Sequence, residues 1–545
     1  MQLQGQHVLI LGLGASGLAM ARWCARAGAE VSVADTRDAP PQLAALQAEW
    51  PSVRFVAGPL VAGLVEGTSV RAVFRSPGLA PEVVAPVVNA AQAMGLWQGG
   101  ELSLFAAALN DLYTRCAYQP HVLAITGTNG KTTVTALTGQ LVARAGKSVQ
   151  VAGNIGPTLL DTLTEALTQA QTQIDAQAAS EVQDNVEVEL PTEATSSETE
   201  YKVTQRHPLA AALPEVWVLE LSSFQLDSSE GFEPTAATVL NVSQDHLDWH
   251  GDMTAYAAAK ARIFGPQTLM VLNREEPQVM AMRPAPVRAK LQKPVERECL
   301  LFGGDMPQRP GDFGIEVANG MTWLVRALEA DETRRRRKDQ EDDLHIQRLI
   351  PADALRIRGR HNAVNALAAL ALASSAGCAL GPMLYGLREY RGEPHRVEPV
   401  AIIDGVEFFD DSKGTNVGAT VAALKGLGAD RRIVAILGGE GKGQDFSPLA
   451  EPIARFARAV VLIGRDAPLI RAALQDSAAL LHDAADMASA VSLAAELAQS
   501  GDAVLMSPAC ASFDMFDHYV HRAEVFVQAV SELAEAAGVA MEGGL

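Results

Sequence analysis

The stretch that decides the fold is AITGTNGKTTVTAL, residues 124–137. A strand-like apolar run, Val122 to Thr126, leads into a glycine loop, and Lys131, Thr132 and a helix-forming segment follow at once. This order is typical of a P-loop, whose backbone amides surround nucleotide phosphates while the lysine neutralises them and the hydroxyl binds Mg²⁺. The long pattern GxxxxGK[ST] would need Gly at Ile125, so the match is to the shorter form GTNGKTT. A chance GKT in a surface turn is the alternative.

A second glycine loop lies near the N-terminus. GLGASG, Gly12 to Gly17, follows the apolar run His7 to Leu11, and Asp35 closes the next such run, EVSVAD. Glycines in this pattern let backbone N–H groups approach a pyrophosphate, and the carboxylate can accept from a ribose hydroxyl. We predict a nucleotide diphosphate here. Tight packing of strand on helix without any ligand is the alternative.

Strand-like runs ending in glycine turns alternate with alanine-rich helical stretches along most of the 545 residues, which predicts an α/β chain built on parallel sheets. Further strands are expected at 433–437, 460–463 and 503–506. We predict three domains, each with a Rossmann-like, mostly parallel sheet and flanking helices, and a P-loop-type ATPase fold in the centre. Their expected limits are 1–117, 118–397 and 398–545.

Two insertions are expected in the central domain, at about 161–212 and 325–350. The first is rich in Gln, Thr, Ala and Glu, a composition that cannot bury much. We predict a solvated segment with a short helix at its start, dispensable for chemistry. The second contains the charge run DETRRRRKDQEDD, 331–343, which is typical of a solvated loop.

Composition limits the classes of function. A formal net charge of −20 argues against a nucleic-acid partner or an anionic membrane. The five cysteines form no CxxC pair, and no apolar run is long enough to span a bilayer, so we expect a cytoplasmic protein without membrane insertion. A monomer is expected, although the sequence does not determine the oligomeric state.

Polar residues follow further apolar runs of the central domain. Glu220 ends the run in VLELSSFQL, and Asp245 and His246 lie in NVSQDHLDWHG. Such groups at the carboxyl ends of parallel strands suit Mg²⁺ held among phosphate oxygens. Ordinary polar residues that close strands are the alternative.

The chain resembles the Mur ligase family, on motifs that occur in order through all three predicted domains. These are GLGASG, ADTR, SPG (76–78), GTNGKTT, GNIG (153–156), LELSSFQL, NVSQDHLDWHG, GRHNAVNALAA, PHR, DDSKGTN, LGGEGKGQDF and SPACASFDMF. Within the family, the resemblance is greatest to the members that add D-glutamate to UDP-N-acetylmuramoyl-L-alanine. It implies an ADP-forming amide ligase of peptidoglycan precursor synthesis that uses ATP, Mg²⁺ and an acyl-phosphate intermediate.

The resemblance also implies roles for individual residues. The catalytic set is Lys131, His246 and Lys260. The ATP site comprises Gly127, Thr128, Asn129, Gly130, Lys131, Thr132, Thr133, Asn365, Arg396 and Asp411. The UDP end of the substrate is assigned to Ser16, Asp35, Thr36, Arg37, Asn154 and His246, and D-glutamate to Thr415, Lys442 and Ser512. The metal ligands are Thr132, Glu220, His246 and Lys260.

Two Mg²⁺ ions and a carbamylated Lys260 are part of this expectation. An ammonium group next to magnesium would be repelled, whereas a carbamate supplies oxygen ligands. A surface lysine on the helix TAYAAAKARIF is the alternative. Departures from the family pattern at Gly414, Glu440 and Tyr519 are chemically mild and affect fine positioning.

Rival classes explain fewer motifs. A folylpolyglutamate synthetase would share GTNGKTT but would not need GLGASG. A nicotinamide-dependent oxidoreductase would leave Lys131, His246 and DDSKGTN without a purpose. A non-enzymatic nucleotide sensor would leave the glutamate-side motifs unused.

Overall fold

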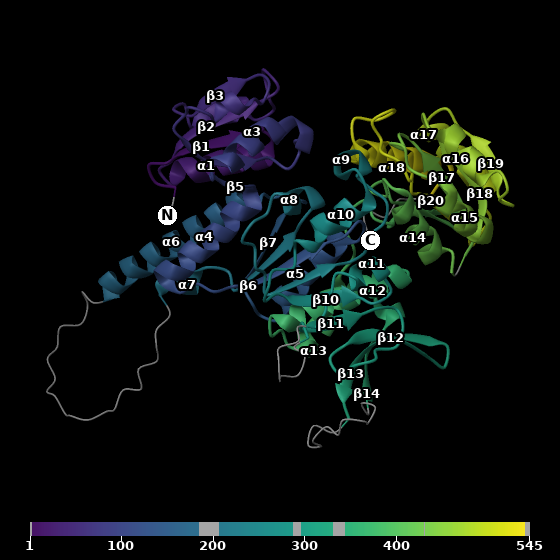
Figure 1. Ribbon diagram of the computed structural model, residues 1–545. Coiled ribbons are helices and arrows are strands. Elements are labelled where there is room, and N and C mark those ends of the chain that lie inside the picture. Colours follow the sequence, from purple (N-terminus) through teal and green to yellow (C-terminus); the bar gives the residue numbers. More distant parts are fainter. Residues whose placement is uncertain (1–2, 185–206, 287–295, 331–343, 430, 540–545) are drawn as a thin grey trace.

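The structure, a computed structural model, describes residues 3–184, 207–286, 296–330, 344–429 and 431–539. Figure 1 shows three α/β lobes in chain order, from the purple first lobe through the teal central lobe to the green and yellow third lobe. Each lobe holds a mainly parallel sheet, as the sequence predicts. Among the described helices, none combines the length and apolar character needed to cross a bilayer.

The first lobe is built on a parallel sheet with the strand order β3-β2-β1-β4-β5. Its central strands form because Val, Ile and Leu side chains are buried on both faces, as expected for a parallel sheet covered by helices. Strand order reverses between β1 and β4, so a crevice opens at their carboxyl ends, where the glycine loop begins. The elements are β1 (His7–Leu11), α1 (Ala15–Arg26), β2 (Glu30–Asp35), α2 (Leu43–Glu49), β3 (Arg54–Ala57), β4 (Val70–Arg75), α3 (Pro81–Ala93) and β5 (Trp97–Gly99).

The central lobe holds a six-stranded parallel sheet in the order β11-β10-β9-β6-β8-β7. Helices α5 and α12 cover one face through an alanine- and leucine-rich core. Helices α4 and α6 cover the other face, in a core continuous with that of the first lobe. Its elements up to β9 are α4 (Glu101–Cys116), β6 (His121–Thr126), α5 (Lys131–Arg144), β7 (Val149–Gly153), α6 (Leu159–Asp184), α7 (Pro208–Ala212), β8 (Val216–Glu220), α8 (Ser223–Asp227) and β9 (Ala236–Val239). They continue with α9 (Leu247–His250), α10 (Met253–Ala261), β10 (Leu269–Asn273), α11 (Pro277–Met280), β11 (Cys299–Phe302), α12 (Arg360–Ser375) and α13 (Leu380–Glu389).

The expectation that 161–212 begins with only a short helix and buries little is wrong for its first part. Residues 159–184 form the long helix α6, which packs on α1 and α4. Leu163, Ala166 and Ala170 are almost completely buried there, because small and aliphatic residues recur on one face at helical spacing. This part of the segment is a piece of the core, and its dispensability for chemistry stays a prediction. Residues 185–206 lie outside the described part of the chain.

The second expected insertion, 325–350, also contains regular structure. The strands β12 (Phe313–Ala318), β13 (Met321–Glu329) and β14 (Leu344–Pro351) form a separate antiparallel sheet. Leu324 and Ile350 face each other in its register and are buried. Strands β13 and β14 therefore form a partly buried hairpin on either side of the charge run. The run itself, 331–343, lies outside the described residues.

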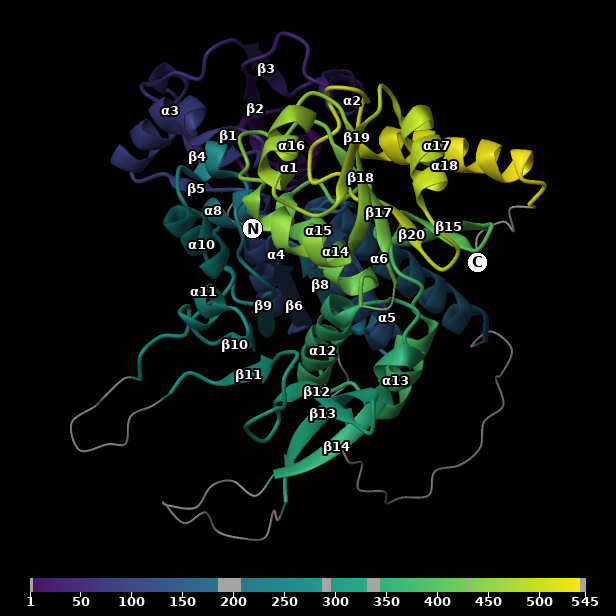
Figure 2. The same ribbon diagram turned by 90° about the vertical axis from the view of Figure 1, so that its right-hand side faces the viewer.

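The third lobe has the strand order β15-β16-β20-β17-β18-β19, in which only the β15–β16 pair is antiparallel. The strands predicted at 433–437, 460–463 and 503–506 are confirmed as parts of β17, β18 and β20. Figure 2 shows this lobe in front of the central helices. Its elements are β15 (Glu398–Ile403), β16 (Val406–Asp410), α14 (Val417–Leu427), β17 (Ile433–Gly438), α15 (Ala450–Phe456), β18 (Ala457–Ile463), α16 (Ala467–Leu474), β19 (Leu480–Asp483), α17 (Met487–Leu497), β20 (Ala503–Met506) and α18 (Tyr519–Ala536).

Candidate active site

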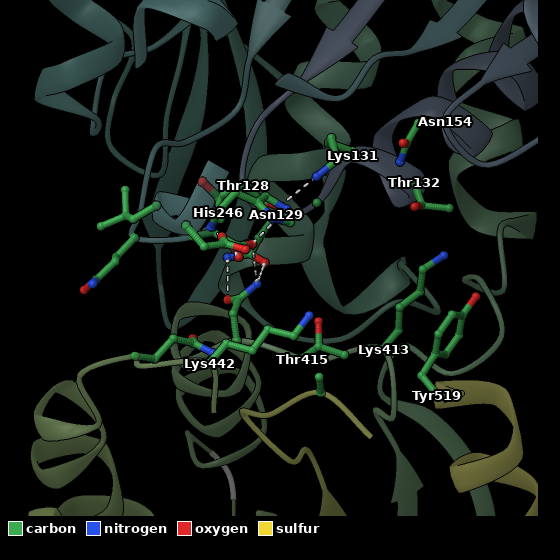
Figure 3. Close-up of a pocket in the computed structure, with 18 of the residues that line it drawn as sticks. Thr128, Asn129, Lys131, Thr132, Asn154, His246, Lys413, Thr415, Lys442 and Tyr519 are labelled. Atoms are coloured by element: carbon green, nitrogen blue, oxygen red, sulfur yellow. Dashed lines mark hydrogen bonds and ion pairs between the residues drawn. The ribbon is translucent and has the colours of Figure 1, made fainter. Parts of the chain in front are cut away.

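A cleft of about 480 Å³ lies between the central and third lobes. In Figure 3, Lys131, Thr132, Asn154 and His246 of the central lobe face residues of the third lobe across it. The lining is mostly polar and carries charges of both signs. The predicted site residues that line it are Thr128, Asn129, Gly130, Lys131, Thr132, Asn154, Glu220, His246, Arg396, Thr415 and Lys442.

The P-loop runs from β6 into α5, as predicted. Gly130 has φ +82°, and a Cβ at this position would lie 2.9 Å from Oδ1 of Asn365. Only glycine fits this backbone conformation without strain, and the contact places Asn365, on α12, directly behind the loop. The loop is also held by Asn241, whose Oδ1 accepts from the backbone N–H of Asn129 at 2.8 Å.

Lys131 folds back over the loop that it follows. Its Nζ donates to the backbone carbonyls of Gly127 and Thr128, both at 2.9 Å. Burial lowers its pKa, Glu220 and Asp245 oppose this shift, and the positive charge of Arg396 adds to it. An anion that enters the loop would therefore approach a lysine that is shielded from bulk water.

Arg396 comes to the P-loop from the segment that joins the central and third lobes. Its Nη2 donates to the hydroxyl of Thr132 at 2.7 Å. Its Nε is buried and has no hydrogen-bond partner in the described structure, so this guanidinium has unused capacity to donate to a phosphate. Two cations therefore meet at the start of α5, as an ATP phosphate chain requires.

Glu220 ends β8 and lines the cleft together with the P-loop. Its Oε1 accepts from Nδ2 of Asn154 at 2.9 Å, while its Oε2 is buried without a partner in the described structure. Together with the hydroxyl of Thr132, this carboxylate is the kind of oxygen donor that Mg²⁺ prefers. The residues present therefore fit ATP and Mg²⁺ at the P-loop.

His246 lies in the left-handed region of the backbone, with φ 54°. Its ring packs edge-on against Phe224, with the centroids 4.7 Å apart, and lies 3.6 Å from the Asp245 carboxylate. Burial lowers the pKa of His246, Asp245 opposes the shift, and Lys131 and Lys260 add to it. A neutral imidazole has a free nitrogen lone pair for a metal ion or a proton.

Lys260 is buried, which excludes the alternative of a surface lysine. Only 1% of the residue is exposed, although α10 is a short helix near the surface of the lobe. Its Nζ donates to the Gly127 carbonyl at 2.9 Å and lies 4.4 Å from the ring centroid of Tyr256. Burial, and secondarily Lys131, lowers the pKa of Lys260 well below its ordinary value.

The third lobe presents its loops to the P-loop. Thr415 and Lys442 line the cleft, and Lys413 lines it beside Tyr519, with Nζ 5.4 Å from the ring centroid. Ser512 is buried at the turn that follows β20, next to the lining residue Ala511. These positions are compatible with the predicted amino-acid site.

Two residues that tie this arrangement together were not predicted from the sequence. Asn416 exchanges side-chain hydrogen bonds with Asn129 of the P-loop, at 3.1 and 3.3 Å, and so joins the two lobes. Arg522 is 1% exposed and donates to the carbonyls of Ser412 and Cys510. It therefore joins the loop after β16 to the loop after β20. Asn416 lies within the motif DDSKGTN, whereas an arginine on an amphipathic helix gives no signal of burial.

Of the residues assigned to the UDP end, Asn154 and His246 line this cleft, whereas Ser16, Asp35, Thr36 and Arg37 lie in the first lobe, outside it. The Asp35 carboxylate is completely buried and accepts from the backbone N–H of Leu13 at 2.7 Å and from the backbone and guanidinium of Arg37. These four hydrogen bonds use the capacity of a carboxylate. Asp35 therefore fixes the loop and Arg37, and direct acceptance from a ribose hydroxyl would require Arg37 to move.

Three other predicted residues lie near the cleft without lining it. Asn365 stands behind the P-loop, and Thr133 is buried in α5. Asp411 is buried, and its Oδ2 accepts from the Ser507 hydroxyl at 2.6 Å. Burial raises the pKa of Asp411 to about 7. A ribose contact by Asp411 stays a prediction.

Comparison with known proteins identifies the chain's family. A model of the Mur ligase middle domain matches residues 125–295, the Mur ligase glutamate ligase domain matches 395–510, and the MurD-like N-terminal domain matches 6–97. The chain belongs to the Mur ligase family. The match to an N-terminal domain of this kind argues against a folylpolyglutamate synthetase, and the match to a glutamate ligase domain argues against an oxidoreductase or a sensor.

Mur ligase relatives are similar over nearly the whole chain. UDP-N-acetylmuramoylalanine–D-glutamate ligase of Albidiferax ferrireducens is 65% identical over 541 residues, with 99% of each chain covered. The ligase of the same name from Burkholderia mallei is 52% identical over 542 residues, covering 97% of this chain and 98% of that one. The structure of MurF ligase from Thermotoga maritima in complex with ADP has a TM-score of 0.52 at 16% identity, covering 97% of this chain and 96% of the other, and shows the shared fold.

Proposed function

We propose that the chain is an ADP-forming ligase that joins D-glutamate to the L-alanyl carboxylate of UDP-N-acetylmuramoyl-L-alanine in peptidoglycan precursor synthesis. The observation that carries the proposal is the single cleft in which the P-loop, Arg396 and the loops of the glutamate ligase domain meet. The relative that is 65% identical carries the name of this activity. In the proposal, residues 1–117 hold the UDP end, 118–397 hold ATP, and 398–545 hold the amino acid.

The reaction needs an activated carboxylate, because a free carboxylate does not react with an amine. The alanyl carboxylate oxygen takes the γ-phosphoryl group, and the D-glutamate amine then attacks the acyl carbon and releases phosphate. ATP with Mg²⁺, held by the P-loop amides, Thr132, Glu220 and His246, would supply the phosphoryl group and positive charge at the transferring oxygens.

The chain's own groups bring three anionic species together. Lys131 and Arg396 meet at the start of α5 and offset the charge of the phosphates. On the other side, Lys442 and Lys413 line the cleft and can pair with the two carboxylates of glutamate. The hydrogen bonds between Asn129 and Asn416 join the two lobes that carry these cationic groups.

The finer metal chemistry belongs to the same proposal. We infer that Lys260 is carbamylated and that two Mg²⁺ ions are bound, with Thr132, Glu220, His246 and the carbamate as ligands. The lowered pKa of Lys260 supports this, because only the uncharged amine reacts with CO₂ and burial beside Lys131 favours that form. A carbamate would then replace a buried positive charge by two oxygen ligands.

Phosphate release tests the proposed function. The chain is given ATP, Mg²⁺, UDP-N-acetylmuramoyl-L-alanine and one amino acid from a panel that includes both enantiomers of glutamate. We expect release only with D-glutamate and only when the nucleotide sugar is present. Release with L-glutamate and a folate, or release that ignores the nucleotide sugar, would contradict the proposal.

A further inference from the structure

A buried carboxyl group with an unused oxygen lies between the first and central lobes. Glu101, the first residue of α4, is 2% exposed. Its Oε1 accepts from the backbone N–H of Leu160, in the first turn of α6, at 3.0 Å. Its Oε2 is buried and has no hydrogen-bond partner in the described structure. An unsatisfied buried carboxylate oxygen is costly, so its presence needs an explanation.

Opposing effects act on this carboxyl group. It lies at the N-termini of α4 and α6, which favour an anion, but burial raises its pKa to about 7. From α6, the N–H groups of Leu160 and Leu159 lower the pKa, while the charge of Asp161 raises it. From α1, the hydroxyl of Ser16 lowers it. Arg22 of α1 lies 3.4 Å from Asp161 and offsets part of that charge.

Ser16 connects this group to the glycine loop of the first lobe. It belongs to GLGASG and lies in the first turn of α1, where the backbone N–H groups of a helix N-terminus attract phosphate. A diphosphate at this loop would bring negative charge close to the carboxyl group whose pKa the Ser16 hydroxyl lowers. Like charges in a poorly solvated site favour the neutral form of a carboxyl group.

We propose that Glu101 is a positioning residue of the nucleotide-sugar site, which takes up a proton from solvent on Oε2 when a diphosphate binds at the glycine loop. The new O–H donates to the Ser16 oxygen, and the Ser16 hydroxyl then directs its own hydrogen to a phosphate oxygen. This inference rests on the proposed function in placing the UDP end of the substrate at Gly12–Gly17. Glu101 itself touches neither the reacting atoms nor ATP.

Calorimetry in paired buffers tests the inference. UDP-N-acetylmuramoyl-L-alanine is titrated into the full chain between pH 6.5 and 8.5, in buffers of different ionisation enthalpy. The diphosphate and carboxylate of this ligand remain ionised throughout, so any proton uptake belongs to the protein. We expect net proton uptake on binding that increases as the pH rises, with affinity falling accordingly.

Two variants separate this role from a structural one. Glu101→Gln keeps the shape of the group but cannot titrate, so binding should show no proton uptake and no fall in affinity over this pH range. Glu82→Gln is the matched control, because Glu82 is an exposed carboxylate in the first turn of α3 in the same lobe. It should retain the proton uptake of the parent.

The outcomes distinguish the inference from the proposed function. Binding without proton uptake by the parent, or equal uptake by Glu101→Gln, overturns the role of Glu101 and leaves the proposed function intact. Absence of binding overturns both, because the first lobe would then not hold the nucleotide sugar. If Glu101→Gln does not fold, absence of proton uptake by the parent still overturns the inference.

Discussion

The two glycine loops of this chain follow the same order of strand, glycine turn and helix but differ in their surroundings. In the first, a Cβ at Gly17 would lie 2.0 Å from the carbonyl oxygen of Gly12, and the nearby Asp35 carboxylate is fully occupied by Leu13 and Arg37. In the second, the cations Lys131 and Arg396 and the unsatisfied Oε2 of Glu220 lie around the cleft that Gly130 lines. In the proposed function, the first loop holds the nucleotide sugar and the second stabilises the charge that changes during phosphoryl transfer. Similar local sequences thus acquire different chemistry from residues distant in the chain.

We expect the largest effect from Lys131→Ala in the second loop. Loss of one preorganised charge at a phosphoryl group typically costs about 10²-fold or more in turnover, so we expect activity to fall by at least that factor without loss of folded protein. ATP-dependent phosphate release measures the effect. Lys147→Ala is the control, since Lys147 lies in the same lobe and pairs with Glu215 outside the cleft. Unchanged activity of Lys131→Ala would remove the P-loop from the reaction.

Lys260→Ala sharpens the role of the buried lysine behind the same loop. If Lys260 carries a carbamate, the variant loses oxygen ligands and we expect turnover to fall by about 10²-fold, the typical cost of losing a group at the charged centre. Added formate or acetate should restore part of the activity by occupying the vacated position. Mass spectrometry of the parent should find the carbamate. Parent-like turnover at limiting Mg²⁺ would show that the second metal is held another way.

In the first loop, Gly17→Ala and Gly14→Ala form a matched pair. A Cβ at Gly17 would collide with the Gly12 carbonyl, whereas one at Gly14 meets only the Ser76 hydroxyl at 3.9 Å. Overpacking of this kind costs about 1–3 kcal/mol, so we expect Gly17→Ala to lower thermal stability and raise the KM for the nucleotide sugar. Gly14→Ala should leave the thermal stability close to that of the parent. Equal effects of the two changes would show that the packing of strand on helix does not determine the conformation of the loop.

The smallest effect is expected from Asp35→Asn, and it depends on pH. The Arg37 side chain lowers the pKa of Asp35 to about 2, below the usual 3.9. The ionised carboxylate therefore stabilises the first lobe above about pH 4, by roughly 2 kcal/mol, and this contribution is lost as the pH falls toward 2. Hydrogen exchange of β1 and β2 should be faster in the variant at pH 7 and equal to that of the parent near pH 2. A difference that persists at pH 2 would exclude this electrostatic origin.

Most of the fold could be predicted because the deciding signals are local. Apolar runs that end in glycine turns locate β1, β6 and β17, and strand-end positions indicate Glu220. The predicted P-loop and the polar residues of the cleft lie close together because parallel strands present their carboxyl ends at one edge of the sheet. Family resemblance supplied the remaining assignments, such as Arg396 and Lys260.

What could not be predicted depends on contacts between distant segments. The polar composition of 161–212 hid a buried stripe in α6, because Leu163, Ala166 and Ala170 are few among many Gln and Thr residues. The pairing of Asn129 with Asn416 and the burial of Glu101 arise only when lobes or loops meet. No periodicity or spacing in a single sequence records these contacts.

Transfer of labelled oxygen tests most directly the claim that the second loop activates a substrate anchored at the first. UDP-N-acetylmuramoyl-L-alanine with ¹⁸O in its alanyl carboxylate is turned over with ATP and D-glutamate, and the released phosphate is analysed by mass spectrometry. Because the carboxylate oxygen bonds to the γ-phosphorus and leaves with it, we expect one ¹⁸O atom in each released phosphate. Phosphate without label would mean that ATP is cleaved by water and that the carboxylate is not activated in this cleft.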